Sequence, residues 1–447
     1  MKKINKLVLG LVAMFGLSAC TDLDVPPLNV VNDEQILGSE GGVSSYLARV
    51  YGEFPMEDFR YSPNYLYDHF WVLRVPAGLT GEALCREWGG ATTESTSANN
   101  INTFSDQYKL IRELNYFIAK ADKYAGNFKE GQVDKWKGEM LAIRAFTYYQ
   151  MVKRFGGVPL VLDVIDPVGK KNDEINQPRN SEEECWNQIA KDFDDAIKLL
   201  PEKSQQRGRL NKYSAAGLKA RAMVHAGSIA KYNEVSYIDQ NTNKRVCGMD
   251  ASLAKGFFQQ AYDAAKMVEG HYSLYKGEWK ADDANAQYKN FFHIFTDVTN
   301  SEVMLAREYL YPESVHGYNA YNVPHQLRGG NGYSAETCPT LDFVEMFDGL
   351  PKDADGHIAV LNADDTYKLY NDPMDLFANA EPRLRATVVF PNDLMNGENI
   401  EIWRGIYTAA DAATGKIRRL TTAGETRAYQ NIPEVEPKIV YSSNDTQ

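Results

Sequence analysis

The sequence predicts a mostly α-helical protein, in which a tetratricopeptide-like repeat scaffold (an α/α superhelix) carries a loop-rich irregular subdomain. Three observations lead to this fold class. Between residues 104 and 270, apolar side chains recur at spacings of three and four, the period of buried helices. Small and large residues alternate within these helices, and the helices follow one another in pairs, as in α-solenoids. Beyond residue 309, Gly, Asn, Asp, Tyr and Pro dominate, and these residues favour turns and loops.

The segment Lys137–Leu160 contains the most regular of the predicted helices. Its apolar residues fall on two faces, so we expect neighbouring helices to cover it from two sides. Gly156 and Gly157 are expected to end the helix, because glycine adopts the left-handed cap conformation without steric cost. Pro159 then favours an extended exit, since the residue before proline avoids the α region. The segment is therefore predicted to be a central packing element.

The other elements are predicted in chain order. Ser181 and Glu184 form a capping-box pattern at the start of a helix. Arg144 and Arg221 lie within apolar helices, where a buried guanidinium needs a partner, so we expect each to bridge neighbouring repeats. Glu302–Arg307 alternates like a strand. The expected helices span Asp33–Phe54, Phe104–Tyr124, Ser181–Leu200, Lys212–Ser228, Leu253–Gly270 and Thr340–Phe347.

The N-terminus has the pattern of a lipoprotein signal peptide, which we place at residues 1–19. Three early lysines precede the short apolar run Leu7–Leu17, which is too short to span a bilayer comfortably. The run ends in Leu-Ser-Ala-Cys, which resembles a bacterial lipobox, so we expect lipid attachment at Cys20. An ordinary signal-peptidase site with an incidental cysteine is the alternative. Residues 20–32, rich in Pro and Asp, are predicted to be an extended tether.

Composition and motifs exclude several classes of function. A formal net charge of −12 makes the chain a poor candidate for binding nucleic acid. The sequence contains no H-E-x-x-H, G-x-S-x-G, P-loop or G-x-G-x-x-G motif, and no cysteine pair with metal-ligand spacing. Lys352–Gly356 faintly resembles a calcium loop, but Asn362 stands where a closing Glu would be needed, so a solvated turn is favoured. We therefore expect no metal and no cofactor.

Several motifs, in order along the chain, resemble the SusD/RagB family of Bacteroidetes outer-membrane lipoproteins. The resemblance extends from Cys20 to about Arg404, and each motif alone is weak, whereas the ordered set together with a lipobox is specific. The motifs are Arg144–Tyr149, Arg154–Leu160, Ile189–Pro201, Gly208–Ala222, Asn300–Met304, Pro339–Gly349 and Glu381–Leu384, the last with Glu where the family usually has Asp.

The resemblance implies a protein anchored in the outer membrane by a lipid and exposed at the cell surface. It also implies an oligosaccharide ligand, which the protein would deliver to a TonB-dependent, SusC-like transporter without catalysis. Within the resemblance, residues 33–310 correspond to the N-terminal helical repeat region and residues 311–447 to the loop-rich C-terminal region. Family members continue with further helical sequence, whereas this chain stops at Gln447 after a polar run, so we expect the C-terminal region to be incomplete.

Two loops have the composition of a sugar-binding site. Sugar recognition needs aromatic faces for the C–H side of the ring and planar polar groups for the hydroxyls. Trp88 with Arg86 and Asn99 meets this need in a loop before a scaffold helix, and a second, glycine-rich loop could converge with it. The residues predicted from the second loop are Tyr318, Tyr321, Arg328 and Tyr333.

Each of these interpretations has an alternative. Trp88 could anchor its loop on the scaffold, and the tyrosines could pack against the transporter. Trp71, Trp279 and Trp403 lie among apolar neighbours and are expected in the core. For the whole chain, a protein- or peptide-binding scaffold without sugar affinity is the second hypothesis. A surface glycoside hydrolase is the third, because its paired carboxylates need not be close in sequence.

Overall fold

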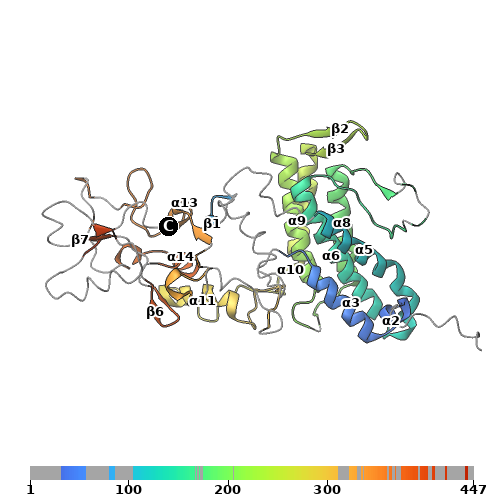
Figure 1. Cartoon of the computed structure of the whole chain (residues 1–447), viewed down its shortest axis with the longest axis horizontal. Helices are drawn as coiled ribbons and strands as arrows, with labels where there is room; N and C mark the ends of the chain where they lie inside the picture. Colours follow the sequence, from blue (N-terminus) through green and yellow to red (C-terminus); the bar gives the residue numbers. More distant parts are fainter. Residues whose placement is uncertain are drawn as a thin grey trace, which may run out of the picture. The chain divides into compact units, whose positions relative to one another are not determined.

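The computed structural model is mostly helical, as the sequence predicts, and it divides into two compact units (Figure 1). Unit 1 comprises residues 1–54, 107–202 and 221–259, and unit 2 the remainder. The described residues are 32–56, 80–85, 104–166, 168, 171, 175–204, 206–310, 322–329, 334–335, 337–359, 362–364, 368, 374–390, 393–400, 405–407, 418–419 and 438–440. Among them, no helix is both long and apolar enough to cross a membrane.

Helices form the scaffold, and most of them lie in unit 1. The predicted helix at Asp33–Phe54 is two helices, separated at Gly38 and Ser39, and the other predicted helices are confirmed with small shifts at their ends. Ser181 and Glu184 form both hydrogen bonds of the predicted capping box. The helices are α2 (Asp33–Leu37), α3 (Glu40–Glu53), α5 (Phe104–Lys120), η2 (Ala121–Asn127), α6 (Gln132–Phe155), α8 (Glu182–Leu199), α9 (Lys212–Tyr232), η3 (Ala251–Leu253) and α10 (Ala254–Val268).

Helix α6 is the centre of unit 1. Every residue from Gly138 to Val152 is buried, so neighbouring helices and the segment around Val161 cover it on all sides rather than on the two predicted. Gly156 ends the helix with φ 69°, a conformation that favours glycine. The N–H of Gly157 then donates to the carbonyl of Val246 at 2.7 Å, which fixes the exit of the chain.

Arg144 of α6 joins three helices, which confirms its predicted structural role. Its guanidinium donates to both carboxylate oxygens of Asp192 in α8, at 2.7 and 2.8 Å, and to the side-chain oxygen of Asn115 in α5, at 2.8 Å. All three side chains are buried. Their hydrogen bonds to one another satisfy the polar groups inside the helix stack. The same prediction for Arg221 is wrong, because that residue lies on the exposed side of α9.

A β-hairpin contacts the first turn of α8. It consists of β2 (Tyr237–Asp239) and β3 (Lys244–Cys247), paired antiparallel. The ammonium of Lys244 lies 2.8 Å from a carboxylate oxygen of Glu184, and the N–H of Gly248 donates to Glu182 at 2.6 Å. Both carboxylates belong to the first turn of α8, where negative charge is favourable.

Unit 2 contains short elements, in line with the predicted loop-rich subdomain. Within the described residues of unit 2, the strands pair as three small sheets: β1 with β4, β5 with β6, and the order β8-β7-β9, all antiparallel. Its elements are β1 (Ala83–Cys85), α11 (Ala284–Thr296), η4 (His325–Leu327), β4 (Thr337–Pro339), α13 (Leu341–Glu345), η5 (Asp375–Phe377), α14 (Pro382–Thr387), β5 (Leu394–Met395), β6 (Glu398–Asn399), β7 (Gly405–Tyr407), β8 (Arg418–Arg419) and β9 (Lys438–Val440).

Two predictions about unit 2 fail. Residues 302–307 form no strand, because polar side chains hold the turn before them: Asn300 accepts from the N–H groups of Glu302 and Val303. Helix α11 has no counterpart among the helices predicted from the sequence. Its aromatic residues hide the helical period that marks the scaffold helices.

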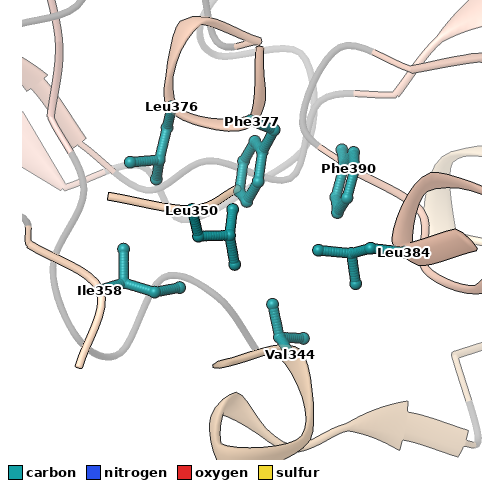
Figure 2. Close-up of a cluster of buried hydrophobic side chains, with 7 residues drawn as sticks. All are labelled: Val344, Leu350, Ile358, Leu376, Phe377, Leu384 and Phe390. Carbon is teal, nitrogen blue, oxygen red and sulfur yellow. The ribbon is translucent and has the colours of Figure 1, made fainter. Parts of the chain in front are cut away.

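Seven buried side chains form the core beneath the short elements of unit 2 (Figure 2). The rings of Phe377 and Phe390 stack with their centroids 4.3 Å apart and their planes 7° from parallel. Leu384 of α14 is fully buried in the same cluster. The cluster holds α13, η5 and α14 together without long secondary structure. Its members are Val344, Leu350, Ile358, Leu376, Phe377, Leu384 and Phe390.

Candidate functional site

The structure describes one of the predicted ligand residues directly, Arg328. It also describes the segments that flank the two predicted loops. The other predicted residues lie outside the described part of the chain: Cys20, Arg86, Trp88, Asn99, Tyr318, Tyr321 and Tyr333.

The two predicted loops are connected to one small sheet. Strand β1 pairs antiparallel with β4, and Cys85 at the end of β1 lies opposite Thr337 at the start of β4. Arg86 follows Cys85 directly in the sequence, and Tyr333 precedes Thr337 by four residues. Because the strands are antiparallel, the chain leaves β1 and enters β4 at the same end of the sheet. We name this end, Cys85 and Thr337 with their neighbours, the ladder end.

Arg328 belongs to the same neighbourhood. It follows the short helix η4, and just before this helix the carbonyl of Val323 accepts from the N–H of Ala335 at 2.9 Å. Ala335 is two residues before β4. Gln326 of η4 also donates to the carbonyl of Asn399 at 2.9 Å. These hydrogen bonds join the segment that carries the half-buried Arg328 to the chain just before β4 and to β6.

A second feature of unit 2, not predicted from the sequence, is a hollow of about 550 Å³ between α11, η5 and α14. The guanidinium carbon of Arg385 lies 4.8 Å from the centre of the Tyr288 ring, a cation–π distance. The Nε of Arg385 is 3.7 Å from a carboxylate oxygen of Asp393. The lining residues are Ala284, Asn285, Tyr288, Met374, Asp375, Phe377, Ala378, Ala380, Pro382 and Arg385.

Burial also changes the pKa of the Asp393 carboxyl group. Desolvation raises the pKa of its carboxyl group above the ordinary value, against the opposing hydrogen bond from the N–H of Phe390 and the charge of Arg385. A single signal in the sequence could have drawn attention to the hollow, namely the Glu-Pro-Arg-Leu-Arg motif that contains Arg385.

The prediction that Trp279 lies in the core is wrong, since 49% of its surface is exposed. The loop around it is fixed to α11. Asn290 donates to the carbonyl of Tyr275 at 2.9 Å and accepts from the N–H of Glu278, and Gln287 donates to the carbonyl of Lys280. These bonds satisfy the loop backbone and leave the indole outside. Trp71 and Trp403 lie outside the described residues.

The predicted solvated turn at Lys352–Gly356 is confirmed. One carboxylate oxygen of Asp353 accepts from the N–H groups of Asp355 and His357, at 3.0 and 2.9 Å, so this side chain caps the turn. In the described part of the chain, no group of three or more His, Cys, Asp and Glu side chains could hold a metal ion.

Comparisons with known proteins identify the fold. Residues 45–224 match the SusD-like family model described as starch-binding and associating with the outer membrane. A curated relative, SusD-like protein P2 of Formosa agariphila, is 23% identical over 266 residues, which cover 57% of this chain and 49% of the relative. The chain thus spans about half the length of that protein.

Solved structures show the same fold. A SusD-like protein from Bacteroides fragilis superposes with a TM-score of 0.60 at 19% identity, over 83% of this chain and 66% of that one. A SusD-like carbohydrate binding protein from the same species gives a TM-score of 0.55 at 17% identity, over 82% of this chain and 62% of that one. At these identities the likeness establishes the fold, whereas the ligand depends on the residues of this chain.

Proposed function

We propose that this chain, whose residues 45–224 match the SusD-like family model, is a member of that family, binds an oligosaccharide at the cell surface and delivers it to a TonB-dependent, SusC-like transporter. Lipid attachment at Cys20 would hold it on the outer membrane. The protein acts by binding and carries out no catalysis. The family model is described as starch-binding, which supports a glycan as the class of ligand.

One observation carries the location of the site: the antiparallel pairing of Cys85 with Thr337. This pairing starts both predicted loops from one end of a sheet, although about 250 residues separate them along the chain. In this site Trp88 and the tyrosines Tyr318, Tyr321 and Tyr333 stack on sugar rings. The side chains of Arg86, Asn99 and Arg328 then bind the ring hydroxyls.

Titration calorimetry of the whole chain against a glycan panel tests the ligand class. Replacing Trp88 with Ala should lower the affinity of the best glycan about tenfold or more, because a buried aromatic contact contributes roughly 1.5–3 kcal/mol. The matched control is Trp279→Ala, which removes an exposed tryptophan of the same unit that belongs to neither predicted loop and should leave affinity unchanged. Heat with peptides and with no glycan would favour the peptide-binding scaffold instead.

The anchor and the partner need separate tests. The variant Cys20→Ala should leave the outer-membrane fraction and lose incorporation of labelled palmitate. The intact lipoprotein should co-purify with an outer-membrane transporter after mild detergent extraction. Retention of the Cys20→Ala variant in the membrane, with no lipid on the unaltered chain, would contradict the proposed anchor.

A further inference from the structure

We propose that the hollow between α11, η5 and α14 is a second sugar-binding site, distinct from the ladder end, which takes one or two pyranose units of a neutral glycan. This inference depends on the proposed function only for the class of ligand, a glycan. The lining residues that the structure describes all belong to unit 2, and none of them is a residue of the two predicted loops.

Three polar groups that line the hollow are available to a ligand. Arg385 contacts Asp393 through its Nε at 3.7 Å, and within the described residues its two terminal nitrogens form no hydrogen bond. Within the described residues, the hydroxyl of Tyr288 and the side-chain amide of Asn285 form no hydrogen bond either. Together they offer donors and acceptors at the scale of a sugar's hydroxyl groups.

These polar groups are held in place before a ligand arrives. The guanidinium of Arg385 lies over the ring of Tyr288. The carboxylate of Asp393, 3.7 Å from the Nε of Arg385, also holds this guanidinium in place. Phe377, which lines the hollow, is fixed by its stack on Phe390, and Leu384 anchors the helix that bears Arg385 (Figure 2). A pre-organised site loses less conformational entropy on binding, which increases affinity.

The chemistry of the lining selects a neutral sugar. Met374, Phe377 and Pro382 provide an apolar wall for the C–H face of a pyranose, and Arg385 provides a planar fork for adjacent hydroxyls. An anion is disfavoured, because the carboxylate of Asp375 lines the hollow and that of Asp393 lies beside Arg385. The volume of about 550 Å³ falls within the range of small-ligand sites.

Calorimetry with four neutral hexasaccharides, built from glucose, xylose, mannose or galactose, tests the site on the full chain. The variant Arg385→Lys keeps the charge and removes the fork, so the affinity for the bound hexasaccharide should fall about tenfold. Tyr288→Phe keeps the stacked ring and removes the hydroxyl, and a smaller loss is expected. The matched control is Arg383→Lys on the same helix, since Arg383 is exposed and pairs with Glu381 at 2.7 Å.

The outcomes separate this inference from the proposed function. In one outcome, Arg385→Lys binds the hexasaccharide as tightly as Arg383→Lys does, while Trp88→Ala binds it more weakly. The hollow is then not a sugar site, and the sugar binds at the ladder end. If Arg385→Lys weakens binding and Trp88→Ala does not, the hollow is the sugar site and the ladder end fails. Loss in both variants supports two sites. An unaltered chain that binds none of the four hexasaccharides overturns the second site.

Discussion

The surroundings of α6 and the ladder end are organised in opposite ways. Around α6, a continuous run of fifteen buried residues, Gly138–Val152, packs against long helices, and Arg144 is paired with Asp192 and Asn115. At the ladder end, three-residue strands pair over a long separation in sequence, and the neighbouring helix η4 has three residues. The difference indicates that the long helices provide stability, whereas irregular segments fixed by a few hydrogen bonds carry the proposed binding groups.

The largest expected effect is the removal of the buried partner of Arg144. The variant Asp192→Ala leaves a guanidinium uncompensated inside the helix stack, so the free energy of unfolding should fall by about 3–5 kcal/mol. Urea unfolding followed by far-UV circular dichroism measures the loss. The control is Asp195→Ala on the same helix, where the carboxylate pairs with Lys191 and Lys198 at the surface, and a loss below about 1 kcal/mol is expected. Equal losses in the two variants would show that the network around α6 is not the source of stability.

A similar change in unit 2 tests whether packing also supports the hollow. Leu384→Ala opens a cavity in the seven-residue cluster and should destabilise unit 2 by about 2–4 kcal/mol. Sugar affinity at the hollow should fall as well, because Leu384 precedes Arg385 on α14. Leu394→Ala is the control, since Leu394 is 70% exposed. Unchanged unfolding and affinity in Leu384→Ala would mean that the cluster does not position the hollow.

The contrast between the regions also explains which predictions succeeded. The C-terminal end of α6 and the cap of α8 follow from residues close in sequence, such as Gly156 and the pair Ser181 and Glu184. The pairing of Cys85 with Thr337 has no such local signal, because tertiary packing alone brings the two strands together. The hollow was missed for the same reason, since Tyr288 and Arg385 are almost a hundred residues apart.

Exposure was the least predictable property. Arg221 and Trp279 were both assigned to the interior from apolar neighbours in sequence, and both are exposed. Hydrophobic neighbours predict which face of a helix is buried, but a single residue can point away from that face. For Trp279, side chains of α11 fix the loop, and no periodic pattern reports this contact.

The exit of α6 offers a smaller and more local test. A Cβ atom at Gly157 would overlap the carbonyl oxygen of Asn180, so Gly157→Ala should cost about 1–3 kcal/mol in the free energy of unfolding. The control is Gly256→Ala inside α10, where a Cβ would meet open space. There the same substitution should be neutral or stabilise by up to about 1 kcal/mol, because alanine favours the helix. Differential scanning calorimetry compares the two variants, and a destabilised Gly256→Ala would contradict the assigned packing.

The smallest effect concerns the pH dependence of the β2–β3 hairpin contact. Lys244, together with the backbone N–H of Ser181 and the side-chain amide of Asn180, lowers the pKa of Glu184 from 4.5 to about 2. A carboxyl group with a depressed pKa in the folded state contributes stability above pH 4.5 and loses it as the pH falls towards 2. Because 46% of the Glu184 side chain is exposed, screening limits the contribution to less than about 1 kcal/mol. The variant Lys244→Ala should therefore unfold more easily than the unaltered chain at pH 6, and the difference should shrink at pH 2.5. A difference that stays constant between these pH values would mean that Lys244 acts on the hairpin by packing rather than by charge.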